Sequence, residues 1–262
     1  MSERLYGIPV ERIWYWDGQQ ALEPAPCAQL LRYLRLTPEA AHMLKGFRSI
    51  DRADTLVSDL TQCEDEIFGK MDRTFRYHIR RAQKESPELS VYRAEDISRD
   101  ESILAEFRTA YMHFCDAAGN QQLKKGYSAD RIRALIETDG LILTRGIIGN
   151  AKVFHLYVTD GRTAVMRYSA SDFRDAEVDN ALAGRLNKLL HWNDMCYFKS
   201  TGYQYYDWGN VSTANREEYN GIDTFKARFG GDPTVVYNVF VANGLIGAAA
   251  IMGLKILGRK DA

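Results

Sequence analysis

Two neighbouring stretches decide the fold: Gly202-Tyr-Gln-Tyr-Tyr-Asp-Trp-Gly-Asn210 and Gly221-Ile-Asp-Thr-Phe-Lys-Ala-Arg-Phe-Gly-Gly231. The first is rich in aromatic residues and predicts a strand over residues 203–208. The second predicts a short helix over residues 221–229. A β-branched run then predicts a strand over residues 234–241. The C-terminal part of the fold is therefore expected to run strand, helix, strand.

Upstream of these stretches, a long helix is predicted over residues 180–201, and three strand-like runs precede it, at 141–145, 151–158 and 163–169. The last two runs are joined by Asp160-Gly161, a dipeptide typical of a tight hairpin turn. We therefore expect an antiparallel meander followed by a long helix.

Farther upstream, the pattern predicts a strand at 55–60, a helix at 64–85, a strand at 89–93 and helices at 99–117 and 129–138. Thr37 and Ser128 are expected to cap helices that start after them. The fold class is α/β, with a mixed sheet around the central meander and helices on both faces. We expect an N-terminal extension over 1–53, the main domain over 54–242 and an apolar C-terminal helix or tail over 243–262.

Net charge, cysteine spacing and the N-terminal residues limit the partners, metal sites and cellular location that we expect. The net charge is −1 over 262 residues, so any nucleic-acid or membrane partner must use a local patch. The four cysteines have no zinc-like spacing, so we expect no metal and reduced thiols, mostly in the core. The N-terminus lacks the features of a signal peptide, which predicts a cytoplasmic location.

The motifs resemble one known family. Thr144-Arg-Gly-Ile-Ile-Gly-Asn-Ala-Lys-Val153, Thr74-Phe-Arg-Tyr-His-Ile-Arg-Arg-Ala82 and the two stretches quoted first resemble FemAB-like proteins with a single GNAT acyltransferase domain. The resemblance covers about residues 54 to 241. It implies transfer of an acyl or aminoacyl group from a CoA thioester or an aminoacyl-tRNA to an amine or hydroxyl. In that plan the donor lies between two strands that splay apart, here those at 163–169 and 203–208, and exposed backbone amides bind the oxyanion.

One segment departs from the GNAT pattern. CoA-binding members carry a glycine-rich loop before the long helix, and this chain has Phe173-Arg-Asp-Ala-Glu-Val-Asp-Asn-Ala181 there. Its three acidic residues repel phosphate, whereas Arg174 and the helix N-terminus near Asn180 attract it. The Fem-type peptidoglycan aminoacyl transferases also lack this loop and use aminoacyl-tRNA.

The resemblance nominates Lys226 as a catalytic residue, and its place near the end of a predicted strand makes Asp207 a second candidate. Lys226, next to the substrate-binding candidate Phe225, would steady an oxyanion or a carrier phosphate, and Asp207 would deprotonate an incoming ammonium. The alternative is that Lys226 is an ordinary surface lysine and that Asp207 is a turn residue bonded to nearby backbone amides.

Other substrate-binding candidates lie on the meander and on the helix at 64–85. His155, Tyr168 and Ser169 would face the acyl site, or else be ordinary strand residues. Arg76 and Arg80 belong to a basic stripe, with Arg73 and Lys84, that would hold a phosphorylated acceptor or tRNA. The alternative is a solvated stripe neutralised by nearby acidic residues.

The apolar run at 245–257 is too short to cross a bilayer of about 30 Å. Arg259 and Lys260 follow it, a layout that suits a helix lying at a lipid surface, at the inner face of the membrane. A terminal helix docked on the core or on a second subunit would have the same pattern.

Taken together, the sequence predicts an N- or O-acyltransferase that moves an acyl group directly from an acyl-CoA-type donor, such as acetyl-CoA, to an amine or hydroxyl. The acceptor would be a small molecule or a lipid-linked precursor. Two alternatives stay open: an aminoacyl-tRNA-dependent transferase acting on a cell-envelope precursor, and a GNAT-fold protein that binds without catalysis.

Overall fold

A computed structural model describes residues 2–5, 8–14, 24–117, 119, 121–171, 178–212, 217 and 220–256. The chain divides into two compact units. The first comprises Met1–Thr55, Asn210–Tyr219 and Pro233–Ala262, and the second comprises Leu56–Gly209 and Asn220–Asp232. The C-terminal strand and helix therefore belong to the same unit as the N-terminal residues.

The first unit is a sheet with strand order β1-β2-β3-β10-β4. The strands are β1 (Ser2–Leu5), β2 (Ile8–Trp14), β3 (Leu30–Leu36), β10 (Asp232–Ala242) and β4 (Arg48–Asp59), the last of which continues into the second unit. Helix α1 (Pro38–Met43) begins at Thr37, whose side chain accepts a hydrogen bond from the Ala40 amide, so this predicted cap is confirmed. Helix α10 (Leu245–Ile256) buries Ile251 against Leu30 and Phe240.

The second unit is built on the predicted meander. Strands β6 (Leu141–Ile148), β7 (Ala151–Thr159) and β8 (Thr163–Ser171) pair antiparallel, and β5 (Glu88–Arg93) pairs with β6 at the edge. At the β7–β8 turn, the Asp160 carboxylate accepts the amides of Arg162 and Thr163 while Gly161 takes a positive φ. The strand order is β4-β9-β8-β7-β6-β5, where β9 is Tyr205–Val211.

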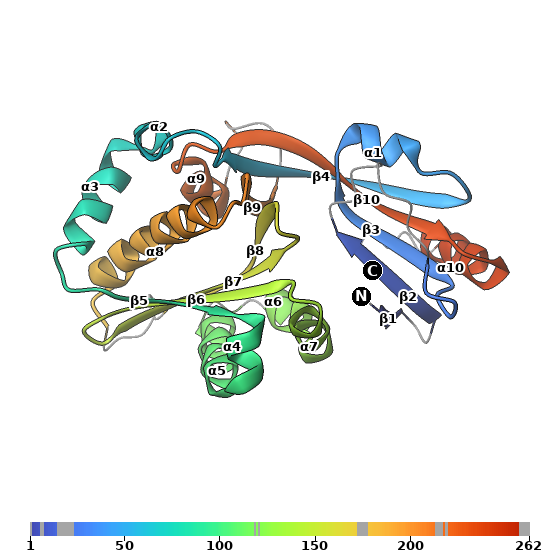
Figure 1. Cartoon of the computed structure of the whole chain (residues 1–262), viewed down its shortest axis with the longest axis horizontal. Coiled ribbons are helices and arrows are strands. Elements are labelled where there is room, and N and C mark those ends of the chain that lie inside the picture. The colour runs from blue at the N-terminus through green and yellow to red at the C-terminus, as the bar shows by residue number, and fades with distance from the viewer. Residues whose placement is uncertain are drawn as a thin grey trace. The chain divides into compact units, whose positions relative to one another are not determined.

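Helices cover both faces of this meander, which confirms the predicted fold class (Figure 1). On one face, α8 (Asn180–Ser200) packs on β6 and β7, and α3 (Arg73–Ala82) packs on α8. On the other lie α4 (Ala94–Arg99), α5 (Ser102–Ala117), α6 (Gln121–Gly126) and α7 (Ala129–Glu137), the last of which is capped by Ser128 as predicted. Helix α9 (Gly221–Ala227) follows β9 in the chain.

The single helix expected over 64–85 is in fact two, α2 (Glu64–Lys70) and α3. The break falls at Asp72, whose carboxylate accepts the amides of Thr74 and Phe75 and so starts a new helix. The cysteines also differ from the expectation. Only Cys115 is buried, and Cys27 and Cys63 are exposed. No helix in the described ranges is long and apolar enough to span a membrane.

Candidate active site

Strands β8 and β9 separate soon after they meet. They pair in parallel at three positions, Thr163 with Tyr205, Ala164 with Tyr206 and Val165 with Asp207, and no register pair joins them beyond this point. Both strands nevertheless continue, to Ser171 and Val211. In addition, β8 bulges where the register shifts opposite Leu156 and Tyr157. Because the two strands continue after their pairing ends, their backbones part, and this splay is a place where a ligand can lie against the sheet.

Gly209 lies at the point where the strands part. Its φ is +75°, and a Cβ there would lie 3.0 Å from the Met166 carbonyl oxygen, so a larger residue would be both strained and crowded. The Gly209 amide donates a 2.9 Å hydrogen bond to the Asp207 carboxylate. Asp207 is buried, and this bond is the turn interaction that the sequence offered as the alternative to a catalytic role.

Lys226 reaches the same point from α9. Asn220 caps that helix by accepting the amides of Ile222 and Asp223, which fixes the helix start and places Lys226 in the last turn. Lys226 is partly buried, and its Nζ lies 3.9 Å from where a Gly209 Cβ would stand. The structure therefore brings Lys226 and Asp207, both predicted from the sequence, close to one glycine.

Phe225 belongs to an aromatic and cationic cluster between α3, α8 and α9. Its ring lies 5.4 Å from that of Phe75, and Lys188 places its Nζ 5.0 Å from the Phe75 ring and 5.7 Å from the Phe225 ring. The guanidinium of Arg228 lies 4.4 Å from the Phe75 ring and bonds to Asp72. Burial, with smaller contributions from Arg228 and Arg185, lowers the pKa of Lys188 to about 8.

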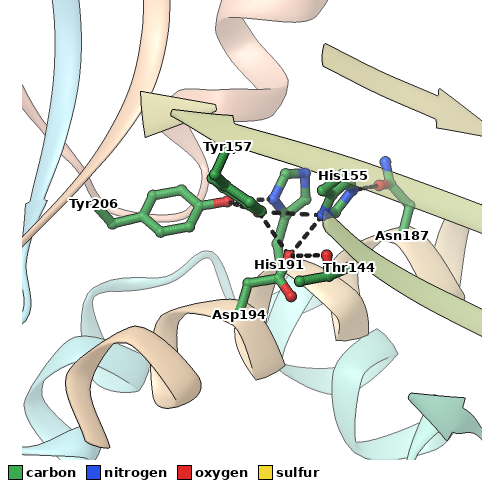
Figure 2. A network of polar contacts seen from close by, with 7 residues as sticks. All are labelled: Thr144, His155, Tyr157, Asn187, His191, Asp194 and Tyr206. Atoms are coloured by element: carbon green, nitrogen blue, oxygen red, sulfur yellow. Dashed lines mark hydrogen bonds and ion pairs between the residues drawn. The ribbon is translucent and has the colours of Figure 1, made fainter. Parts of the chain in front are cut away.

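Behind the splay, a network of buried polar side chains joins β7, β9 and α8 (Figure 2). The Asp194 carboxylate is its centre. Oδ2 accepts from the Tyr157 hydroxyl at 2.6 Å and the Thr144 hydroxyl at 3.1 Å, and lies 2.7 Å from His155 Nδ1. Both side chains of the His155 and Asp194 pair are fully buried. The second carboxylate oxygen, Oδ1, is buried without a hydrogen-bond partner.

The network continues from Asp194 toward α9. The hydroxyl oxygens of Tyr157 and Tyr206 are 2.7 Å apart, and the Tyr206 hydroxyl lies 2.8 Å from His191 Nδ1. Burial raises the pKa of both tyrosines well above 10, with Asp194 acting in the same direction. At the other end, His155 Nε2 lies 2.9 Å from the Asn187 side-chain oxygen.

Three members of this network, His155, His191 and Asp194, bring potential metal-binding atoms within 4.8 Å of one another. Two observations argue against a shared metal ion. The two imidazole rings stack, with centroids 4.0 Å apart and planes 27° apart, so their in-plane lone pairs run side by side instead of converging. His155 Nδ1 and Asp194 Oδ2 also bond to each other. The cluster is better described as a hydrogen-bond network.

The remaining candidates on the sheet and α8 are dispersed. Ser169 pairs with His155 across β7 and β8, so it lies on the face that carries the network. Tyr168 points to the opposite face, where its hydroxyl donates to the Gly126 carbonyl at 2.8 Å. Asn180 is the exposed first residue of α8, and the Asp179 carboxylate before it accepts the Ala181 amide. Arg174, Asp175 and Glu177 lie outside the described residues.

Arg76 and Arg80 lie on α3. Arg80 is exposed, with its guanidinium 5.2 Å from the Phe68 ring, and Arg76 buries its Nε without a partner. Among the described residues neither forms an ion pair, whereas the neighbouring Arg81 pairs with Glu85. The stripe therefore keeps uncompensated positive charge.

Sequence reasoning missed most of the network, namely Tyr157, His191, Asp194, Tyr206 and Asn187. A signal was present. Asn187, His191 and Asp194 recur at spacings of four and three, which puts three polar residues on one face of a largely apolar helix, and His155 and Tyr157 share one face of a strand.

Comparisons with solved structures agree with this fold. The C-terminal domain (DUF2156) assigned to a lysylphosphatidylglycerol synthetase of Agrobacterium fabrum superposes with a TM-score of 0.56 and 14% identity, over 88% of this chain and 73% of that one. FemX superposes with a TM-score of 0.53 and 13% identity, over 83% of this chain and 73% of that one. L-PGS from Bacillus licheniformis superposes with a TM-score of 0.50 and 11% identity, over 88% of this chain and 74% of that one.

No protein-family model and no curated protein sequence matches the chain. At identities this low, the likeness is one of fold. The chain therefore has the FemAB-like, GNAT-type fold that its motifs predicted.

Proposed function

We propose that this protein is an aminoacyl transferase that moves an aminoacyl group from aminoacyl-tRNA to an amine or hydroxyl of a lipid-linked or other cell-envelope acceptor. One observation carries the proposal: β8 and β9 part after Val165 and Asp207, and Lys226 reaches the point where they separate, at Gly209. A place where two strands part beside a lysine ammonium suits a carbonyl group that develops negative charge during transfer.

The reaction can proceed by direct attack of the acceptor on the donor. The acceptor nitrogen or oxygen attacks the ester carbonyl carbon, and the negative charge that collects on the carbonyl oxygen is balanced by the Lys226 ammonium. The bond to the carrier oxygen then breaks. No covalent enzyme intermediate is needed, because donor and acceptor can meet in one ternary complex.

Three observations favour aminoacyl-tRNA over acyl-CoA as the donor. Asp179 occupies an amide at the start of α8, the position at which CoA-binding GNAT proteins hold pyrophosphate. Arg76 and Arg80 keep positive charge on α3. One structural neighbour is named for lysylphosphatidylglycerol, an aminoacyl ester of a phospholipid, and the Fem-type transferases that the motifs resemble use aminoacyl-tRNA.

The donor can be tested by titrating the protein with charged tRNA and, separately, with acetyl-CoA. We expect binding of tRNA that weakens steeply with salt, and Arg76→Gln and Arg80→Gln should each reduce the slope of log K against log salt by about 1. Arg99→Gln is the matched control, because Arg99 is an exposed helical arginine that already pairs with Glu95. Saturable stabilisation by acetyl-CoA without tRNA binding would instead support acyl-CoA as the donor.

A lipid-linked acceptor also suits the first unit. Leu245 is 90% exposed and Ile246 58% exposed at the start of α10, and Phe47, itself exposed, accepts the amide of Ala242 through its carbonyl oxygen. We propose that these side chains contact the membrane surface from the cytoplasmic side. Co-sedimentation with phosphatidylglycerol vesicles tests this. Leu245→Ser with Ile246→Ser should reduce binding, whereas Met252→Ser, farther along the same helix, should reduce it less.

A further inference from the structure

The network around Asp194 fixes the proton positions along the series Tyr157, Tyr206 and His191. A carboxylate only accepts hydrogen bonds, so the Tyr157 hydroxyl donates its one proton to Asp194 Oδ2. Tyr157 must then accept from Tyr206, and Tyr206, having given its proton away, must accept from His191 Nδ1. Hence His191 carries its proton on Nδ1.

His191 is also held neutral. It is 3% exposed, and burial lowers its pKa well below 6.5, with His155, Lys188 and Lys226 acting in the same direction. A neutral imidazole with its proton on Nδ1 has a free lone pair on Nε2. No described residue forms a hydrogen bond with that nitrogen.

The ring stands in the neighbourhood of Lys226. Its centroid lies 4.8 Å from that of Trp208, which precedes Gly209, and 5.8 Å from that of Phe225, which precedes Lys226. Both motifs that mark the splay therefore pack on the same imidazole. A base here would lie beside the cation that steadies the oxyanion.

We propose that His191 is the general base of the transfer reaction, and that Tyr206, Tyr157 and Asp194 are positioning residues that hold its tautomer. The proposal rests on the proposed function. As the acceptor attacks, its N–H or O–H bond breaks, the electron pair forms the new bond to the carbonyl carbon, and the proton goes to Nε2. The same proton then leaves Nε2 for the carrier oxygen when the bond to the carrier breaks.

The tautomer can be read without any substrate. Nitrogen NMR of the labelled wild-type protein should show His191 protonated on Nδ1 and bare on Nε2. Tyr206→Phe removes the acceptor of that proton and should produce a mixture of tautomers. Tyr168→Phe, a matched change on the opposite face of the sheet, should leave the signal unchanged. A wild-type His191 protonated on Nε2 would overturn the proposal.

Activity provides the second arm. His191→Gln should lower kcat by about 10²–10⁴-fold, with donor binding and thermal unfolding retained as controls. Tyr206→Phe should lower kcat less and shift the acidic limb of the pH–rate profile. The groups facing His191 that also titrate are His155 on β7, Tyr206 on β9, Lys188 and Asp194 on α8, and Lys226 on α9.

The two outcomes are distinguishable. If His191→Gln still transfers with the wild-type kcat, His191 is not the general base, and the proposed function is unaffected. Absence of transfer by the wild-type protein with every donor would overturn the proposed function, and the base with it. Should His191→Gln fail to fold, the wild-type NMR measurement still decides the tautomer.

Discussion

The two faces of the meander in the second unit are built from alternate residues of the same strands, yet they differ in kind. Toward α8, His155 and Tyr157 join Asp194 in a buried polar network. Toward α5, Phe154 and Tyr168 pack with the rings of Phe107 and Tyr111. Packing alone accounts for the second face. A buried network with an orphaned carboxylate oxygen is costly to stability, so packing does not account for the first face, and the proposed chemistry is assigned to it.

The largest difference between the faces should appear on removing the charge at the network's centre. Asp194→Ala leaves the Tyr157 and Thr144 hydroxyls and His155 without their common acceptor in a buried site. We expect the free energy of unfolding to fall by about 3–5 kcal/mol, measured by urea denaturation. A loss below about 1 kcal/mol would mean that the network is not formed in solution.

Coupling between residues should also separate the faces. Tyr157→Phe and Tyr206→Phe share one hydrogen bond in a chain, so their effects on the free energy of unfolding should be non-additive by about 0.5–3 kcal/mol. The cycle formed by Tyr111→Phe and Tyr168→Phe, whose rings touch without a hydroxyl–hydroxyl bond, should be nearly additive. Equal coupling in the two cycles would contradict the difference between the two faces.

Acid should weaken the polar face. The pKa of His191 is lowered in the folded protein, so the unfolded chain binds more protons once the pH falls below about 6.5. Stability from this group is therefore complete above that pH and is lost as the pH drops toward the folded pKa, by up to about 1.4 kcal/mol per pH unit. Denaturation between pH 7.5 and 5 measures this, and His191→Gln should flatten the profile.

The smallest effect is expected on the aromatic face. Tyr168→Phe removes one hydrogen bond to the Gly126 carbonyl and leaves the ring packing intact, so stability should fall by about 1 kcal/mol or less. The transfer rate should not change. A large loss of transfer with unchanged stability would restore Tyr168 as a substrate-binding residue.

Much of the fold was accessible from local pattern. The Asp160-Gly161 turn, the spacing of the strands and the apolar periodicity predicted the meander and the long helix, and both are present. The break at Asp72 was missed because the apolar spacing continues from Phe68 to Phe75 across it, and only the carboxylate's bonds to the Thr74 and Phe75 amides reveal a new start. The grouping of β10 with the N-terminal strands depends on long-range pairing that no local pattern encodes.

The site was accessible only in part. Lys226 and Asp207 were named from motifs, and the structure places them around Gly209. The histidines at 155 and 191 are 36 positions apart in the sequence, and they meet because α8 packs over β7 and stacks their rings. Which polar residues of a strand meet which residues of a helix depends on how the two elements pack, and a single sequence does not contain that information.

The rate of aminoacyl transfer in a single turnover tests both the proposed function and the role of Lys226. Total tRNA charged with radiolabelled amino acids would be mixed with a lipid extract containing phosphatidylglycerol and lipid-linked cell-wall precursors. Wild-type protein should move label into the lipid fraction, Lys226→Met should do so about 10²–10³-fold more slowly, and Lys125→Met, an exposed lysine on α6, should match the wild type. A folded Lys226→Met protein with the wild-type rate would contradict the role of Lys226, and a wild-type protein that transfers no label from tRNA would contradict the proposed function.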